Sequence, residues 1–187
     1  MEQVAAAVIP FIGWGLYPAW LVAGGCDYLC HRATDIGYTS GPTESWLHVA
    51  QFATLLALLC FAIFVTPSWL GAGLLVVCVI AHSALSLIDV SYTVTRRHVS
   101  VFEQFVHGFM DVIPCVAVAL LIAVQWPLRA APEWRTSIDP GSWLLLGSFI
   151  VLSGLPIFEE LIRTYRQAAG SSQRAATLMG NEPAGHG

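Results

Sequence analysis

Five long apolar stretches, separated by short polar connections, dominate the chain. They lie near residues 4–31, 43–66, 68–94, 101–126 and 141–166. The connections hold turn formers such as Gly41 and Pro42, and the longest connection contains Pro132 and Pro140. A bilayer core about 30 Å thick is crossed by roughly 20 apolar helical residues, so each stretch is long enough to span a membrane. The pattern predicts an all-α, polytopic membrane bundle of about five transmembrane helices.

The two ends of the chain lead to separate expectations. No basic region precedes the first apolar run, so we interpret Val4 onward as a spanning helix and not as a removed signal peptide. From Ala168 the chain becomes polar and rich in glycine, serine and alanine. We therefore predict a transmembrane domain over residues 1–167 and a disordered cytoplasmic tail over residues 168–187.

Composition and charge support this interpretation and suggest an orientation. Only 11% of the residues are charged, against roughly 25% in soluble domains. The chain has no lysine, and most of its arginines follow the first, third or fifth stretch. The positive-inside rule then places the N-terminus outside and the C-terminus in the cytoplasm. A net charge of −4 gives no reason to expect a nucleic-acid partner.

Ionisable residues recur at helical spacing in four of the five stretches. Asp27 precedes His31 by four positions, and Glu44 precedes His48 by the same interval. Residues four apart share one face of a helix, so each stretch presents a polar stripe. We predict that the stripes converge and supply metal ligands. The predicted ligands are Asp27, His31, Glu44, His48, His82, Asp89, Glu103, His107 and Asp111.

Depth in the membrane makes these stripes chemically informative. All four lie in the half of the bundle predicted to face the cytoplasm. An ionised side chain at the bilayer centre costs about 2.5–3.5 kcal/mol, so nine such groups require compensation. Carboxylates and histidines on facing helices build di-iron and di-manganese sites, and this ligand type suits iron, manganese or zinc. We predict two bound metal ions, with iron as the leading candidate and zinc or manganese as alternatives.

Further polar residues lie close to the same stripes. Gln51 and Ser86 continue two of them, and Tyr92 follows Asp89 by three positions. We predict that these three support the ligands through hydrogen bonds. Glu159 and Glu160 end the fifth stretch on the same side, and the sequence leaves open whether either one joins the site.

Simpler roles for several of these residues stay open. Glu103 follows Ser100 by three positions, as in a capping box. Glu44 lies in the first turn of its helix, where the helix dipole favours an acid. Asp27 and Asp89 lie at helix C-termini, where the dipole disfavours an anion. Those two can instead pair with arginines of the adjoining connections.

Several short segments carry a resemblance. The run Cys30-His31-Arg32, the segment 39–45 with His48, and Glu103-Gln104 with His107 resemble a family of small bacterial inner-membrane proteins. The resemblance covers most of residues 20–115 and implies that location, but no activity. In chemistry, though not in sequence, the predicted site is similar to that of membrane di-iron oxygenases and desaturases. This chain lacks their HxxxH and HxxHH boxes.

The leading functional hypothesis is a membrane-embedded di-iron oxidoreductase that acts on a hydrophobic or lipid-like substrate at the cytoplasmic side. Electrons would come from a separate donor, because the chain has no flavin, nicotinamide or iron–sulfur motif. A zinc-dependent membrane hydrolase is the first alternative. The others are a non-enzymatic metal carrier, sensor or transporter, and a haem-binding electron-transfer protein that uses two of His48, His82 and His107.

Overall fold

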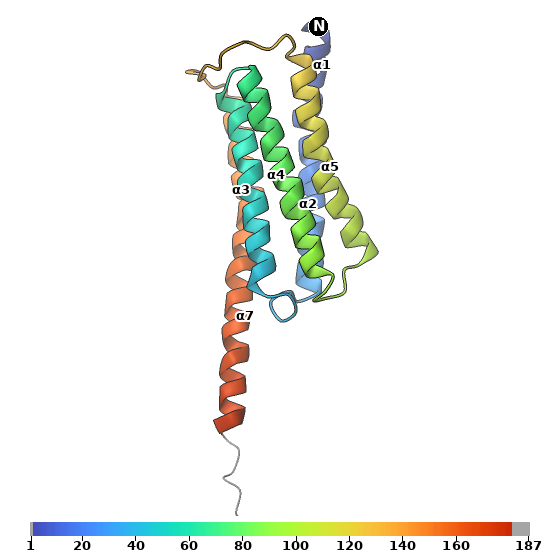
Figure 1. The fold of residues 1–187 in the computed structure, drawn as a ribbon, viewed down its shortest axis with the longest axis vertical. Coiled ribbons are helices and arrows are strands. Elements are labelled where there is room, and N and C mark those ends of the chain that lie inside the picture. Colours follow the sequence, from blue (N-terminus) through green and yellow to red (C-terminus); the bar gives the residue numbers. More distant parts are fainter. Residues whose placement is uncertain (1, 181–187) are drawn as a thin grey trace, which may run out of the picture.

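The computed structural model describes residues 2–180, and these residues form a bundle of long helices (Figure 1). Five helical segments are long and apolar enough to cross a membrane, as the sequence predicts. The described residues contain no strand. The elements are α1 (Glu2–Phe11), η1 (Ile12–Leu16), α2 (Tyr17–Ala33), α3 (Pro42–Phe64), α4 (Trp69–Thr93), α5 (Val101–Val124), α6 (Pro140–Phe149), η2 (Ile150–Gly154) and α7 (Leu155–Gly180).

Two wide π-helical turns interrupt the first and the last long helices. η1 joins α1 to α2, and η2 joins α6 to α7, so each set forms one continuous helix. A proline follows each π turn by two residues, at Pro18 and Pro156. Proline lacks the backbone N–H and crowds the preceding turn, which accounts for the widening at these places.

Each helix contacts the next in the order α7, α3, α4, α5 and α2. This row closes where α2 contacts η2. The apolar centre lies at the closure, where the ring of Trp20 stacks on that of Phe149 with centroids 5.5 Å apart. The Trp20 indole N–H donates to the carbonyl of Met110 at 3.2 Å, which joins α2 to α5. Contacts between distant helices therefore meet in the middle of the bundle.

The connections lie at the two ends of the bundle. Residues 34–41 and 94–100 lie at one end, which we name the polar end, and residues 65–68 and 125–139 lie at the other (Figure 1). Gly41 adopts a φ of +73°, a left-handed conformation that glycine adopts without strain, and α3 begins directly after it. The Ser100 hydroxyl accepts the Glu103 N–H and caps α5, as the sequence predicts.

The fifth long helix ends later than its predicted boundary. α7 continues to Gly180, past the predicted span limit at 166 and into the predicted tail. Residues 167–180 include four alanines and two glutamines, which favour helix. The remaining part of the predicted disordered tail, residues 181–187, lies outside the described residues.

Candidate metal centre

Five helices bring ionisable side chains together just inside the polar end of the bundle. Each of these side chains is at least nine-tenths buried. Such burial is rare for charged residues unless they are paired or bind a metal. We name this set the inner cluster. It comprises Asp27 and His31 from α2, Glu44 and His48 from α3, Asp89 from α4, Glu103 from α5 and Glu160 from α7.

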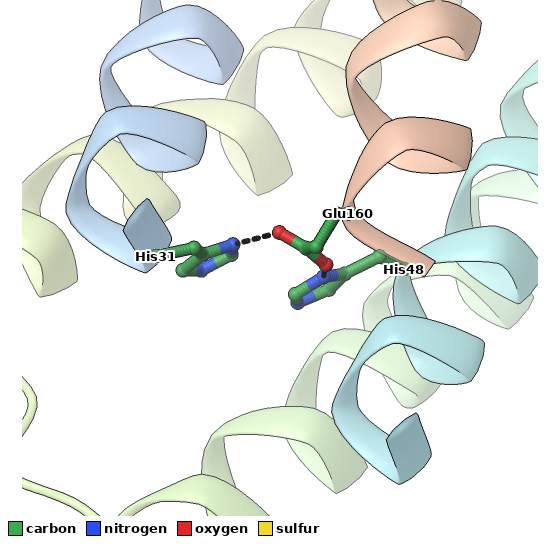
Figure 2. A group of neighbouring side chains, drawn as sticks. All are labelled: His31, His48 and Glu160. Atoms are coloured by element: carbon green, nitrogen blue, oxygen red, sulfur yellow. Dashed lines mark hydrogen bonds and ion pairs between the residues drawn. The ribbon is translucent and has the colours of Figure 1, made fainter. Parts of the chain in front are cut away.

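One carboxylate holds both histidines of the inner cluster (Figure 2). A Glu160 oxygen lies 3.0 Å from Nδ1 of His31, and its other oxygen lies 2.6 Å from Nδ1 of His48. The two imidazoles stack with centroids 4.5 Å apart and planes within 2° of parallel. Because a carboxylate only accepts hydrogen bonds, each Nδ1 donates its proton to Glu160, and in a neutral imidazole the lone pair then lies on Nε2. Both Nε2 atoms are thereby prepared as metal ligands.

The Nε2 atom of His31 faces three carboxylates. It lies 3.4 Å from Asp27 Oδ2, 3.6 Å from Glu103 Oε1 and 3.9 Å from Glu44 Oε1. Ligand atoms of Asp27, His31 and Glu103 all lie within 4.8 Å of one another. These three residues form the first ligand set, and their side chains come from α2 and α5.

A second ligand set surrounds Nε2 of His48. This atom lies 3.2 Å from Asp89 Oδ2, and ligand atoms of Glu44, His48 and Asp89 lie within 4.8 Å of one another. Gln51 donates to the same Asp89 oxygen at 3.2 Å, so its predicted supporting contact is present. Because Glu44 also approaches His31, its carboxylate lies between the two sets and is placed to bridge them.

A small cavity separates the two ligand sets. It has a volume of about 20 Å³, enough for a water-sized occupant, since one water needs roughly 10–15 Å³ by this measure. Its polar lining includes His31, Glu44, Asp89, Arg97 and Glu103. His31, Glu44, Asp89 and Glu103 thus share a space in which an ion fits, while Asp27 and His48 do not line it.

Arg97, from the connection between α4 and α5, closes this space at the polar end. Its guanidinium donates to Glu44 Oε1 at 2.7 Å and to Glu103 Oε2 at 3.1 Å. Burial lowers the pKa of Arg97, but its hydrogen bonds to Glu103 and Glu44 outweigh burial and raise that pKa. The alternative pairing of arginine with Asp27 and Asp89 does not occur within residues 2–180, where those two aspartates face imidazoles instead.

The charges of the inner cluster do not balance. Five carboxylates face the single guanidinium of Arg97, which leaves four negative charges when the imidazoles are neutral. Two divalent cations would supply the missing positive charge. An uncompensated buried charge costs several kcal/mol even after relaxation, so with neutral imidazoles this imbalance favours bound cations.

Three predicted ligands form a separate group one to two helical turns beyond the inner cluster, farther from the polar end. Ser86 Oγ lies 2.7 Å from Asp111 Oδ2 and 2.9 Å from Nε2 of His107. Nε2 of His82 lies 3.5 Å from Asp111 Oδ1. We name these four residues the upper group. It touches the inner cluster through His107 Nδ1, 3.7 Å from Asp27 Oδ1, but its histidines and aspartate belong to neither ligand set.

Glu160 is the main residue that sequence reasoning left undecided. Glu159, its neighbour, points to the surface, where it accepts a 2.7 Å hydrogen bond from the Tyr28 hydroxyl and pairs with Arg32. Consecutive helical residues lie about 100° apart, so only one of the two glutamates can face the bundle. Tyr92 was predicted to support the ligands, but its hydroxyl donates to the carbonyl of Ser40 and fixes the 34–41 connection instead.

A larger cavity of about 80 Å³ adjoins the inner cluster on the side of the upper group. His31, His48 and Glu160 line its polar end, and the rest of its lining is mostly apolar. His31 lines both cavities, so its imidazole lies between the ligand space and the larger cavity. No family model, curated protein or solved structure matches the chain, so the interpretation of the site depends on this geometry.

Proposed function

We propose that this chain is a bacterial inner-membrane protein whose inner cluster binds two iron ions and acts as an oxidoreductase on a hydrophobic substrate. The N-terminus would lie outside and the polar end would face the cytoplasm, following the arginines. One observation carries the proposal. Two parallel imidazoles are held at Nδ1 by a single carboxylate, while both Nε2 atoms face four more carboxylates.

The spacing of the two imidazoles favours two ions over one. Their centroids lie 4.5 Å apart, close to the metal–metal separation of about 3.5–4 Å in dinuclear sites. Each Nε2 has its own aspartate, Asp27 or Asp89, and Glu44 lies between them. A terminal histidine and carboxylate for each ion with a shared glutamate is a typical dinuclear arrangement in helix bundles.

The ligand chemistry favours iron. Carboxylate oxygen and imidazole nitrogen, without thiolate, suit iron and manganese, and bundle sites of this composition hold di-iron centres. When bound, iron would supply oxygen activation and electron transfer. The carboxylates and imidazoles would hold the ions, balance their positive charge and keep them buried away from water. A separate donor would deliver the electrons.

Zinc remains the second candidate because it accepts the same ligands. With zinc, a carboxylate of the cluster would serve as general base and the reaction would be a hydrolysis. The haem alternative receives less support from the geometry. Two of the three possible axial pairs include His48. Its Nδ1 already bonds to Glu160, and its Nε2 points at Asp89.

Elemental analysis of the gently purified protein tests the proposal. We expect about two equivalents of iron per chain and a visible absorption band. Glu44→Ala should lower the content of both ions because this carboxylate lies between the two ligand sets. His98→Ala is the matched control, since His98 is an exposed residue of the 94–100 connection. Tightly bound zinc would favour the hydrolase, and less than about a tenth of an equivalent of any transition metal would refute the metal site.

A further inference from the structure

The larger cavity forms a narrow slot along α2. It runs from His31 up to Trp20, and at a rise of about 1.5 Å per residue this distance is roughly 16 Å. The inner cluster lines one end of it, and Gln51, His82 and Ser153 contribute polar groups farther along. The apolar lining includes Leu21, Phe52, Leu55, Met110, Leu152 and Ile157. These apolar side chains can hold an apolar ligand that places one of its atoms beside the histidines.

The slot opens sideways, through the seam between α2 and the fifth long helix. These two helices touch at η2, and they touch again where Tyr28 and Arg32 bond to Glu159. Between these contacts, α2 presents two consecutive glycines. A Cβ placed on Gly25 would meet no atom within 4 Å, and one placed on Gly24 would meet only Met110 Cε at 3.7 Å.

The surface around the opening is apolar. Gly25 and Leu152 line the slot and are also exposed on the outside of the bundle, so the slot reaches the surface at these residues. Val22 and Leu155, on either side of the seam, are 67% and 64% exposed. Both helices belong to segments apolar enough to cross a membrane. The opening therefore faces the acyl chains of the bilayer and not water.

Volume restricts what can enter. A cavity of about 150 Å³ lined by aliphatic and aromatic residues binds benzene, and this slot has about half that volume. A ring system such as a sterol or a quinone head is too wide for it. A few methylene groups of a linear chain fit, and each buried methylene contributes about 0.8 kcal/mol.

We propose that the slot admits a single unbranched acyl chain from the bilayer and places one of its carbons beside His31 and His48. This inference deepens the proposed function, on which it rests, by naming the substrate class and its route. The chain enters laterally between Gly25 and η2, without leaving the apolar phase. The rigid histidine pair forms the end wall of the slot, and the ligand space lies behind it.

Photo-crosslinking in proteoliposomes tests the inference. The probe is a phospholipid with a diazirine in an unbranched acyl chain, and a parallel sample uses a free fatty acid with the same group. Peptide mass spectrometry should find adducts on slot residues such as Leu21 and Ile157. A Cβ on Gly25 meets no atom within 4 Å, so Gly25→Leu adds a bulky side chain at the opening and should abolish these adducts. The control Gly108→Leu, on the exposed face of α5 and also in open space, should leave them unchanged.

The outcomes are distinct. Adducts confined to lipid-facing residues such as Phe105, or slot adducts that persist unchanged in Gly25→Leu, would overturn the inference. Slot adducts from either probe support it, and the comparison of the probes identifies the source of the chain. Metal content is measured on the same samples. Slot adducts in a protein that binds no metal would refute the proposed function alone, and metal binding without slot adducts would refute only the acyl-chain slot.

Discussion

Replacing Glu160 by glutamine tests the central feature of the site with almost no change in volume. The glutamate accepts a hydrogen bond from Nδ1–H of each imidazole. Glutamine has one accepting oxygen and one donating amide, so it can satisfy only one of the two rings. The other imidazole must rotate away or move its proton to Nε2, and a protonated Nε2 cannot bind a metal.

The expected change in metal stoichiometry and affinity follows from the loss of one of the two hydrogen bonds. One ion should be lost, so the stoichiometry falls from two to one per chain. The remaining ion loses the negative charge that makes its imidazole more basic. Removal of such hydrogen-bond partners typically weakens metal binding 10- to 100-fold, which is about 1.4 to 2.8 kcal/mol. Complete loss of both ions would instead indicate that Glu160 is itself a ligand.

Titration of metal-free protein against a competing chelator measures both quantities. Glu159→Gln is the matched control, because it makes the same change one residue away at the partly exposed surface contact with Tyr28 and Arg32. We expect Glu159→Gln to bind two ions with unchanged affinity. If Glu160→Gln also binds two ions as tightly as the wild type, the assignment of both Nδ1–H groups to one orienting carboxylate is wrong.

Two further predictions separate the parts of the cluster. Arg97→Met leaves two buried carboxylates without their guanidinium, which should cost about 3–5 kcal/mol of unfolding free energy in metal-free protein. Added metal should reduce this loss of unfolding free energy, which thermal unfolding in detergent measures. An equal loss with and without metal would argue against cation binding by these carboxylates. His82→Leu changes a residue of the upper group only, so metal analysis should still find two ions, and the loss of one would assign His82 to the site.

Much of the fold follows from the sequence because the bilayer fixes helix length. Five apolar stretches of adequate length predicted the five long helices, although η1 and η2 were not foreseen. The spacing of four also placed Asp27 beside His31 and Glu44 beside His48 on buried faces. Short-range periodicity is reliable here, since it depends only on the geometry of one helix.

The nine predicted ligands do not all meet in the two ligand sets, because a polar stripe along a helix is longer than one metal site. Each step of four residues advances about 6 Å along a helix. The stripe formed by Glu103, His107 and Asp111 therefore extends about 12 Å, longer than one coordination sphere. Only Glu103 reaches a ligand set, and the other two residues join the upper group. A stripe shows which face is polar but not which of its members meet the next helix.

The choice between Glu159 and Glu160 depends on a feature that hydropathy does not encode. The π turn η2 lies shortly before both residues and accommodates an additional residue within the helix. Glu160 consequently takes the angular position that an unbroken α-helix would give to residue 159. The last long helix contributes no residue to the two sets built on the Nε2 atoms, yet its one inward carboxylate aligns both imidazoles. The metal binding proposed for the first four helices would therefore require the fifth in this particular rotation, and the π turn would contribute to it as well as to packing.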